Sequence, residues 1–222
     1  MSYMWNEFNI KTFPAETVVF RNGQYCPDLS TLPNAPINQN YDLPVHFIFI
    51  GEIAGKINME ISVGAKNQDV IISADLKIKK PAFLNIFIKN AGENSKISGS
   101  ILIDNHSDLE YECNAHHFFK NTAVLIKNKV LAGKNSYSKL SGVAVIDPGC
   151  PDCESDVAIV AMADTGAKID FMPAQYIKSE PKRADHSAAI YKPTDAQILY
   201  LRRAGLSGAE VDATMKEAFL TE

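Results

Sequence analysis

The stretch Val70-Ile71-Ile72-Ser73-Ala74-Asp75-Leu76-Lys77-Ile78 decides the fold class, because apolar and polar side chains alternate along it and many are β-branched. A period of two residues predicts a β-strand with one buried face. Similar short stretches recur from residue 45 to about residue 190, and Gly, Asn and Asp clusters separate them: Ile57–Val63, Phe83–Ile88, Ile101–Ile103, Ala123–Ile126, Val143–Ile146 and Val157–Val160. No helical period intervenes, which excludes a βαβ architecture.

An internal repeat narrows the choice among all-β folds. Ile88-Lys89-Asn90 and the following Gly92–Ser95 recur as Ile126-Lys127-Asn128 and Gly133–Ser136. Ile97-Ser98-Gly99 and Asp104 recur as Leu140-Ser141-Gly142 and Asp147, so the offset grows from 38 to 43 residues along the repeat. A drifting offset indicates stacked coils whose turns accept insertions, so the pattern predicts a parallel β-helix, or β-solenoid. A β-propeller would need a longer chain, whereas a β-sandwich stays open as the alternative.

Length and composition fit one soluble domain with an appendage. The chain has 222 residues, 46% hydrophobic and 22% charged, and a net charge of −4 that gives no basic surplus for nucleic acid. Its longest apolar run, Val45–Ile50, is too short to cross a membrane, and Met1–Glu7 lacks the pattern of a signal peptide. We therefore expect a cytoplasmic protein that binds neither nucleic acid nor membrane. Four cysteines are too few for a disulfide scaffold, so they are expected to be free thiols or metal ligands.

The last thirty residues change period. Thr194-Asp195-Ala196-Gln197 and Ser207-Gly208-Ala209-Glu210 are capping boxes, which predict the starts of two short helices. The second helix has an apolar stripe at Val211, Met215, Ala218 and Phe219. Such a stripe has to dock, and it either covers the open end of the solenoid or presents a face to a partner.

Three regions follow from these patterns. We expect an irregular lead-in with a short strand at residues 1–44, a β-helix core at 45–192 and a helical region at 193–222.

The tail also carries a resemblance. Asp185–Ala189, Leu199–Leu206 and Ala218–Leu220 resemble the C-terminal signature of the SufB/SufD family, the scaffold proteins of iron-sulfur cluster assembly. Asp164–Ala167 is similar to the penultimate coil of that family, and Val18–Gly23 to the element that leads into its core. The resemblance implies a right-handed parallel β-helix followed by a helical C-terminal region, in agreement with the periodicity. Family members are considerably longer, so the chain is similar to a short form.

The resemblance implies a non-enzymatic, SufD-like role. His186 corresponds to a histidine of the SufD branch near the SufB–SufD interface, where it is implicated in cluster assembly or iron handling, and imidazole is a good iron ligand. The alternative is a structural histidine that is hydrogen-bonded to Asp185 or to a neighbouring coil. Thr165 stands where the SufB branch has its essential cysteine, and a hydroxyl cannot replace a thiolate toward iron or sulfide. Transient binding of iron or of an iron-sulfur cluster is therefore implied for the class and stays open for this chain.

Partners are also implied by the resemblance. The family region that docks the SufC-type ABC ATPase matches Leu199–Leu206 and the second helix of the tail. The residues expected to bind the partner are Leu199, Tyr200, Leu201, Arg202, Arg203 and Leu206. The order Arg203-Ala204-Gly205 departs from the usual Ser-Arg-Gly. A SufB-like subunit or a second copy of the chain is the other expected partner, because a short solenoid exposes strand edges.

One motif is not supplied by the resemblance. Cys150-Pro151-Asp152-Cys153 is a C-x-x-C turn, which favours zinc binding or thiol redox chemistry as the alternative function. Two thiols are half of a tetrahedral zinc site, and Cys113, His116 or His117 could complete it; the two histidines are expected to face opposite ways on a strand. The cysteines could equally be incidental to a Pro-Asp turn.

β-Helices also occur among polysaccharide-cleaving enzymes, which need carboxylates and basic residues along one groove. The local cluster of carboxylates here alternates along a polar strand and is expected to be solvated, so the sequence does not predict an enzyme; its members are Asp104, Asp108, Glu110 and Glu112.

Overall fold

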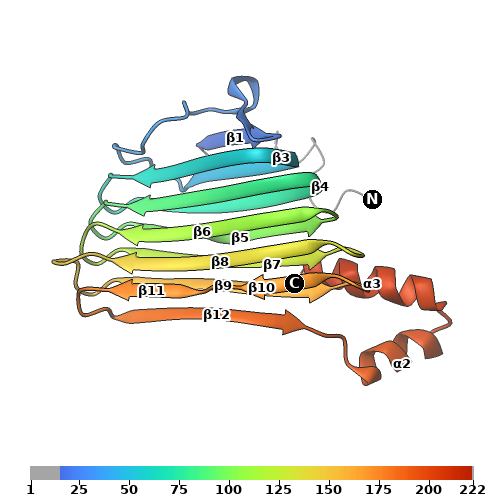
Figure 1. The fold of residues 1–222 in the computed structure, drawn as a ribbon. Helices are drawn as coiled ribbons and strands as arrows, with labels where there is room; N and C mark the ends of the chain where they lie inside the picture. The colour runs from blue at the N-terminus through green and yellow to red at the C-terminus, as the bar shows by residue number, and fades with distance from the viewer. Residues whose placement is uncertain (1–15, 222) are drawn as a thin grey trace.

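The computed structural model describes residues 16–221 and is a β-solenoid of about six turns with two C-terminal helices (Figure 1). Parallel strands stack in register, and each coil contributes one strand to each of two sheets. The prediction of a β-solenoid followed by two helices is confirmed, and the β-sandwich is excluded.

The first sheet, sheet A, contains one strand of every coil. Its strands are β1 (Thr17–Arg21), the first halves of β3 (Val45–Val63) and β4 (Asp69–Asn90), β5 (Lys96–Asn105), β7 (Ala123–Ala132), β9 (Glu154–Ala163) and β12 (Arg183–Tyr191). Sheet B contains the second halves of β3 and β4, followed by β6 (Asp108–His117), β8 (Tyr137–Ile146), β10 (Lys168–Phe171) and β11 (Ala174–Ile177).

The lead-in does contain the expected short strand. β1 pairs in parallel with β3 and so forms the first rung of sheet A, while β2 (Gln24–Tyr25) and the 3₁₀ turn η1 (Pro27–Leu29) follow it. The expectation for residues 1–15 lies outside the described residues.

The register corrects the sequence repeat. Val70, Ile97 and Val124 occupy the same rung position in successive coils, so these coils advance 27 residues each rather than 38. The repeat noted in the sequence relates Ile88, which lies in sheet B, to Ile126, which lies in sheet A. The repeated segment consists of a strand and the turn after it, and its second copy lies on the opposite sheet, one and a half coils later. The two copies are similar because the strands of both sheets alternate in the same way and the corners at both edges of the solenoid need similar turns.

The corners explain the asparagine-rich turns. Asn67, Asn94 and Asn121 have φ values of 57°, 56° and 55°, and Asp152 takes 60° at the next corner. Asparagine and aspartate tolerate this left-handed conformation better than most residues. The stacked amides also bond to each other, since Asn94 Nδ2 donates to Asn67 Oδ1 at 3.1 Å. The corner of Asp152 has seven residues, 147–153, against five at residues 118–122.

The core lies between the two sheets. Alternate side chains of every strand point inward, and the largest fully buried ones include Phe47, Phe49, Leu84 and Tyr111. Tyr111 on sheet B donates to Asn128 Oδ1 on sheet A at 2.5 Å, and this hydrogen bond between the sheets satisfies both buried polar groups.

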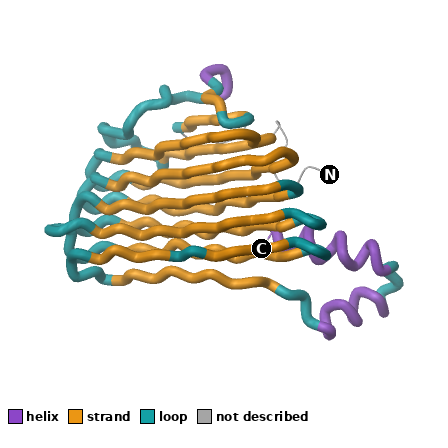
Figure 2. Tube along the Cα trace, in the orientation of Figure 1, coloured by secondary structure: helices purple, strands orange, loops and turns teal. Residues whose placement is uncertain are grey.

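Both predicted capping boxes are present at the helices α2 (Asp195–Arg203) and α3 (Gly208–Thr221). Gln197 N donates to Thr194 Oγ1 at 3.3 Å, and Ser207 N donates to Glu210 Oε2 at 2.8 Å. The apolar stripe of α3 packs on outward-facing side chains of sheet A, namely Leu102, Leu131 and Met162. Figure 2 shows the helices in purple beside the strand ends. They do not cover the open end of the solenoid, because the apolar patch that accepts α3 lies on the side of sheet A.

Candidate functional site

A groove separates the two tail helices. It has a volume of about 410 Å³ and is lined by the end of β12 and by facing residues of α2 and α3: Tyr191, Ala196, Gln197, Tyr200, Leu201, Thr214, Met215 and Ala218. Tyr191 stacks on Phe219 with ring centroids 5.5 Å apart, which joins the end of the last strand to α3. An amphipathic groove on the outside of a scaffold is a suitable surface for a protein partner.

The six residues predicted to dock a partner divide into two groups. Leu201 and Leu206 are half-buried and pack into the apolar cluster that holds α3. Leu199 and Tyr200 are 49% and 73% exposed, and Arg202 and Arg203 are exposed as well, so these four residues present α2 to solvent. Exposed large apolar side chains beside a groove mark an interaction surface more often than an accident of packing.

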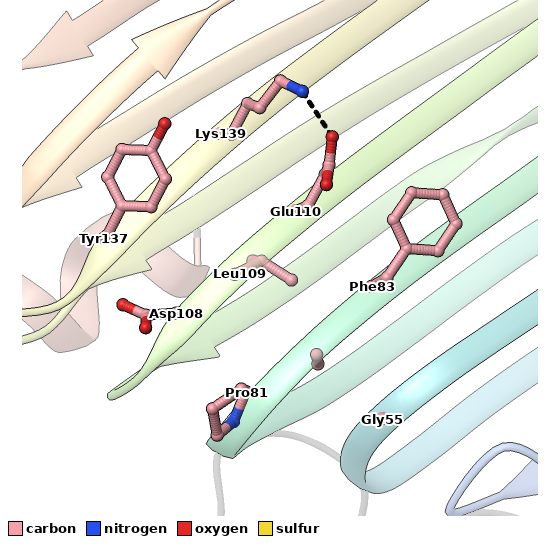
Figure 3. Close-up of a pocket in the computed structure, with 9 residues that line it drawn as sticks. Gly55, Pro81, Phe83, Asp108, Leu109, Glu110, Tyr137 and Lys139 are labelled. Carbon is pink, nitrogen blue, oxygen red and sulfur yellow. Dashed lines mark hydrogen bonds and ion pairs between the residues drawn. The ribbon is translucent and has the colours of Figure 1, made fainter.

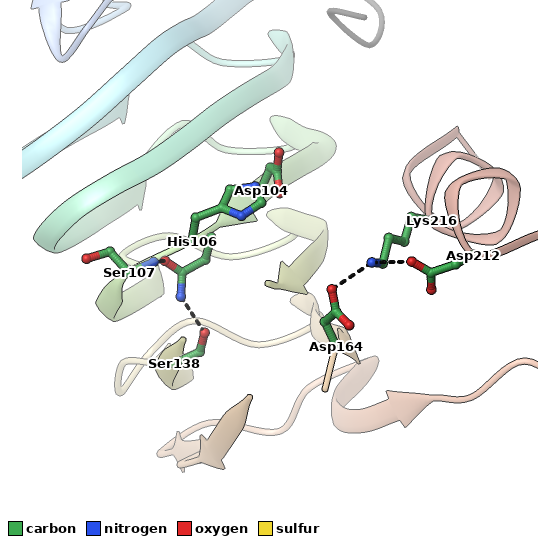
Figure 4. Close-up of polar contacts among 8 residues, drawn as sticks. Asp104, His106, Ser107, Ser138, Asp164, Asp212 and Lys216 are labelled. Carbon is green, nitrogen blue, oxygen red and sulfur yellow. Dashed lines mark hydrogen bonds and ion pairs between the residues drawn. The ribbon is translucent and has the colours of Figure 1, made fainter. Parts of the chain in front are cut away.

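Two lysines that no sequence pattern indicates, Lys216 and Lys129, hold α3 on the solenoid. Lys216 Nζ lies 2.7 Å from Asp164 Oδ2 and 2.6 Å from Asp212 Oδ2, as Figure 4 shows. The Lys216 ammonium holds the pKa of Asp164 below its usual value. From the solenoid side, the buried Lys129 donates to the main-chain carbonyl of Phe219 at 2.8 Å. The groove is therefore fixed relative to sheet A.

The last rung of the solenoid is open. β12 pairs with β9 on one edge, and no other described strand pairs with its second edge. His186 aligns with the buried Val157, so its side chain points to the interior side of the rung, yet it is exposed because no further coil covers it. Ile190 on the same side is 48% exposed. His186 has no hydrogen bond or ion pair with residues 16–221, and Asp185 pairs with Arg183 instead, so the structural alternative for His186 is not supported.

Thr165 lies at an exposed corner. Its N–H donates to Asp164 Oδ1 at 2.6 Å, and its carbonyl accepts from Asn135 N at 3.1 Å. The position where the SufB branch has a cysteine is thus a turn next to the Lys216 contact of α3.

Cys150 and Cys153 are buried at the seven-residue corner. Cys153 Sγ lies 3.2 Å from Thr122 Oγ1, which in turn lies 2.7 Å from His117 Nδ1. Burial raises the pKa of the Cys150 thiol, whereas redox-active cysteines have lowered thiol pKa values. Within residues 16–221 no group of three or more His, Cys, Asp and Glu side chains is arranged to hold a metal ion. The proposed zinc or redox role of this turn stays a prediction.

The other residues considered as zinc ligands are used elsewhere. His116 faces outward, as expected for neighbours on a strand, with Nε2 3.0 Å from Asp147 Oδ2, while His117 is buried. Cys113 lies in the main core beside Tyr111, and burial raises the pKa of its thiol to about 12.

A second cavity, of about 360 Å³, lies at the edge of sheet B (Figure 3). Two of its polar side chains have partners: Lys139 contacts Glu110, and Tyr137 donates to Asp170 Oδ2 at 2.8 Å. Asp104 pairs with His106 at 2.8 Å in another part of the same corner region. Two of the four carboxylates that could have suggested a polysaccharide-cleaving groove, Asp104 and Glu110, are therefore held in separate ion pairs.

Comparison with known families adds one finding. The family model "SUF system FeS cluster assembly, SufBD core domain" matches residues 60–219, which is more than two thirds of the chain. The chain belongs to the SufBD family. The matched range begins near the end of β3 and ends within α3, so it includes the solenoid from β4 onward, the open rung and the groove between the helices. Comparison with curated proteins gives no significant match.

Membership in the SufBD family confirms the resemblance read from the tail and assigns the chain a role in SUF-type iron-sulfur cluster assembly. Among the described residues, no helix is long and apolar enough to cross a membrane.

Proposed function

We propose that this SufBD protein is a non-enzymatic scaffold subunit that docks a SufC-like ABC ATPase on its tail helices. The observation that carries the proposal is the pairing of a preformed groove with exposed side chains: the groove separates α2 from α3, and Leu199 and Tyr200 project from α2 beside it. Aromatic and arginine side chains are enriched at the centres of protein interfaces, which fits Tyr200 with Arg202 and Arg203.

The test is a binding measurement with a purified SufC-like ATPase. Tyr200→Asp places a charge in the centre of the proposed surface and should reduce binding at least about tenfold, which corresponds to 1.4 kcal/mol. Tyr176→Asp is the matched control, since Tyr176 is 57% exposed on β11, away from the tail helices. A chain that ends after Pro193 should not bind. Undiminished binding by the Tyr200→Asp variant would contradict the docking surface.

We also propose that the open rung pairs with a second subunit, either a SufB-like chain or another copy of this one. The unpaired edge of β12 and the exposed interior-facing Ile190 support this pairing, because an open parallel edge invites strand addition. Sedimentation of the purified chain separates the two cases. A dimer that Ile190→Lys dissociates supports self-association, whereas a monomer at micromolar concentration leaves the SufB-like chain as the partner to be tested by copurification.

His186 is the residue we propose for contact with iron, or with a cluster, as the substrate of assembly. Its exposed imidazole faces the open interior of the last rung, where a second subunit would enclose it. Anaerobic copurification followed by iron analysis is the direct measurement. His186→Ala should lose iron that His106→Ala retains, since His106 is equally exposed to solvent but lies at a distant corner.

A further inference from the structure

Lys129 is an unusual residue on the outer side of sheet A. Its neighbour along the strand, Lys127, points outward and is exposed, as expected for a polar position on the solvent side. Lys129 also points outward, but α3 covers it and leaves it 5% exposed, between the apolar side chains that hold the helix. A lysine almost never occupies such a position unless its ammonium has partners.

One partner of Lys129 lies in the last turn of α3. Lys129 Nζ donates to the Phe219 carbonyl at 2.8 Å and lies 5.6 Å from the centroid of the Phe219 ring. The last four carbonyls of a helix have no intrahelical N–H donor, and the negative end of the helix dipole is at the same place. The contact therefore satisfies a free carbonyl and places a positive charge where the helix favours it.

This contact distinguishes the docked position of α3 from neighbouring positions. Most of the remaining interface is apolar packing on Leu102, Leu131 and Met162, together with the stack of Tyr191 on Phe219, and apolar packing has little directionality. If α3 moved by one turn, about 5.4 Å, Lys129 would face the Met215 carbonyl, which the helix already uses for its own hydrogen bond. A move the other way would bring the ammonium beyond the helix end. The ion pair of Lys216 with Asp164, whose side chains are 22% and 25% exposed, also favours the docked position, but it lies at the margin of the interface, whereas Lys129 is buried within it.

We propose that Lys129 fixes the axial register of α3 on the solenoid and thereby positions the groove between α2 and α3. The groove takes three of its lining residues from α3, Thr214, Met215 and Ala218, so a shift of α3 would misalign them with α2 and β12. The effect of this register on ATPase docking rests on the proposed function. The register itself is independent of the proposed function. A buried ion that specifies register rather than adding stability has precedents in other folds.

The register is tested without any partner by measuring a distance between two spin labels. In a Cys26→Ser background, labels at Ser100→Cys on β5 and Ala213→Cys on α3 occupy exposed positions on either side of the interface. Lys129→Met keeps the length of the side chain and removes the charge. We expect one narrow distance for the parent and a distribution shifted or split by about 5 Å, one helical turn, in Lys129→Met.

Two controls separate positioning from packing. Lys127→Met removes a charge from the exposed neighbour and should leave the distance unchanged. Leu131→Ala removes packing beneath α3 but keeps the lysine contact, so it should lower the unfolding midpoint and preserve the distance. The proposal is overturned if Lys129→Met gives the parent distribution, or if Leu131→Ala shifts the distance as much as Lys129→Met does.

Binding of a SufC-like ATPase is the second readout. Lys129→Met should weaken it about tenfold while the unfolding midpoint stays within a few degrees of the parent. An unchanged affinity together with a shifted register would overturn the link between Lys129 and docking. Absence of binding by the parent chain would instead refute the proposed function, and the label distance would still decide the register.

Discussion

The buried His117 predicts a specific loss of stability in mild acid. Its side chain is fully buried in the solenoid, and burial lowers its pKa from 6.5 to about 4, with a smaller effect of the neighbouring His116. The hydroxyl of Thr122 donates to the Phe119 carbonyl at 3.0 Å, so His117 donates from Nδ1. Its Nε2 is buried and has no hydrogen-bond partner among residues 16–221. Protonation would create a buried N–H with no acceptor, which the folded state resists.

The pH dependence of the free energy of unfolding follows from the difference between the pKa of His117 in the folded chain and in the unfolded chain. Between the two pKa values the unfolded chain binds a proton that the folded chain does not, so the free energy of unfolding falls as pH decreases from about 6.5 and levels off below about 4. The full difference corresponds to about 3 kcal/mol. About 2 kcal/mol of it should be lost between pH 7 and pH 5.

The assay is urea unfolding at a series of pH values for the parent chain and for His117→Leu. Leucine cannot titrate and removes the unpartnered nitrogen, so the variant should be about as stable as the parent at pH 7 and more stable at pH 5. The difference between the two curves isolates His117 from other groups such as His46, whose pKa burial also lowers. His186→Gln is the control and should follow the parent. Parallel curves for the parent and His117→Leu would refute the reasoning.

Three further predictions concern thiols, close packing and capping. Titration with a thiol reagent should detect one fast thiol, Cys26, in the native chain and four in denaturant, because the other three cysteines are buried; more than one fast native thiol would contradict this burial. Gly99→Ala should prevent folding or lower the unfolding midpoint severely, because an added Cβ would lie 2.0 Å from the Ile72 carbonyl oxygen of the preceding coil, and a midpoint near that of the parent would show that the coils can separate there. Ser207→Ala should cost about 1 kcal/mol in urea unfolding, since it removes the cap of α3 that Glu210 shares; no loss would mean that packing alone sets the start of this helix.

The fold class and the starts of the two tail helices could be predicted from the sequence. Alternation along strands such as β4 follows directly from burial of one side of each strand, and the capping boxes at Thr194 and Ser207 act through residues three positions away. The length of a coil was not predictable from the repeat, because Asn94 and Asn135 adopt the same left-handed conformation at corners on opposite edges of the solenoid.

The site was predictable only where its signals are local. The exposed residues of α2 lie on one short helix, so a motif could identify them. Lys129 could not be identified, because it looks like any outward lysine of a strand until a helix 90 residues later covers it. Asp164 belongs to a recognisable turn, but its partner Lys216 is 52 residues away. Contacts between the tail and the solenoid depend on tertiary packing and have no signature in either segment alone.

The position of α3 changes how the solenoid is expected to come apart. In a stack where each coil touches only its neighbours, opening begins at an uncovered end and proceeds one rung at a time. Here α3 packs simultaneously on Leu102, Leu131 and Met162, which belong to three successive rungs of sheet A. Because α3 holds these three rungs together, they should open in one cooperative step. The amide protons of β9 should therefore exchange with solvent at the same rate as those of β7 and β5. A partner that binds the tail helices would then act on β5, β7 and β9 together rather than on the last rung alone.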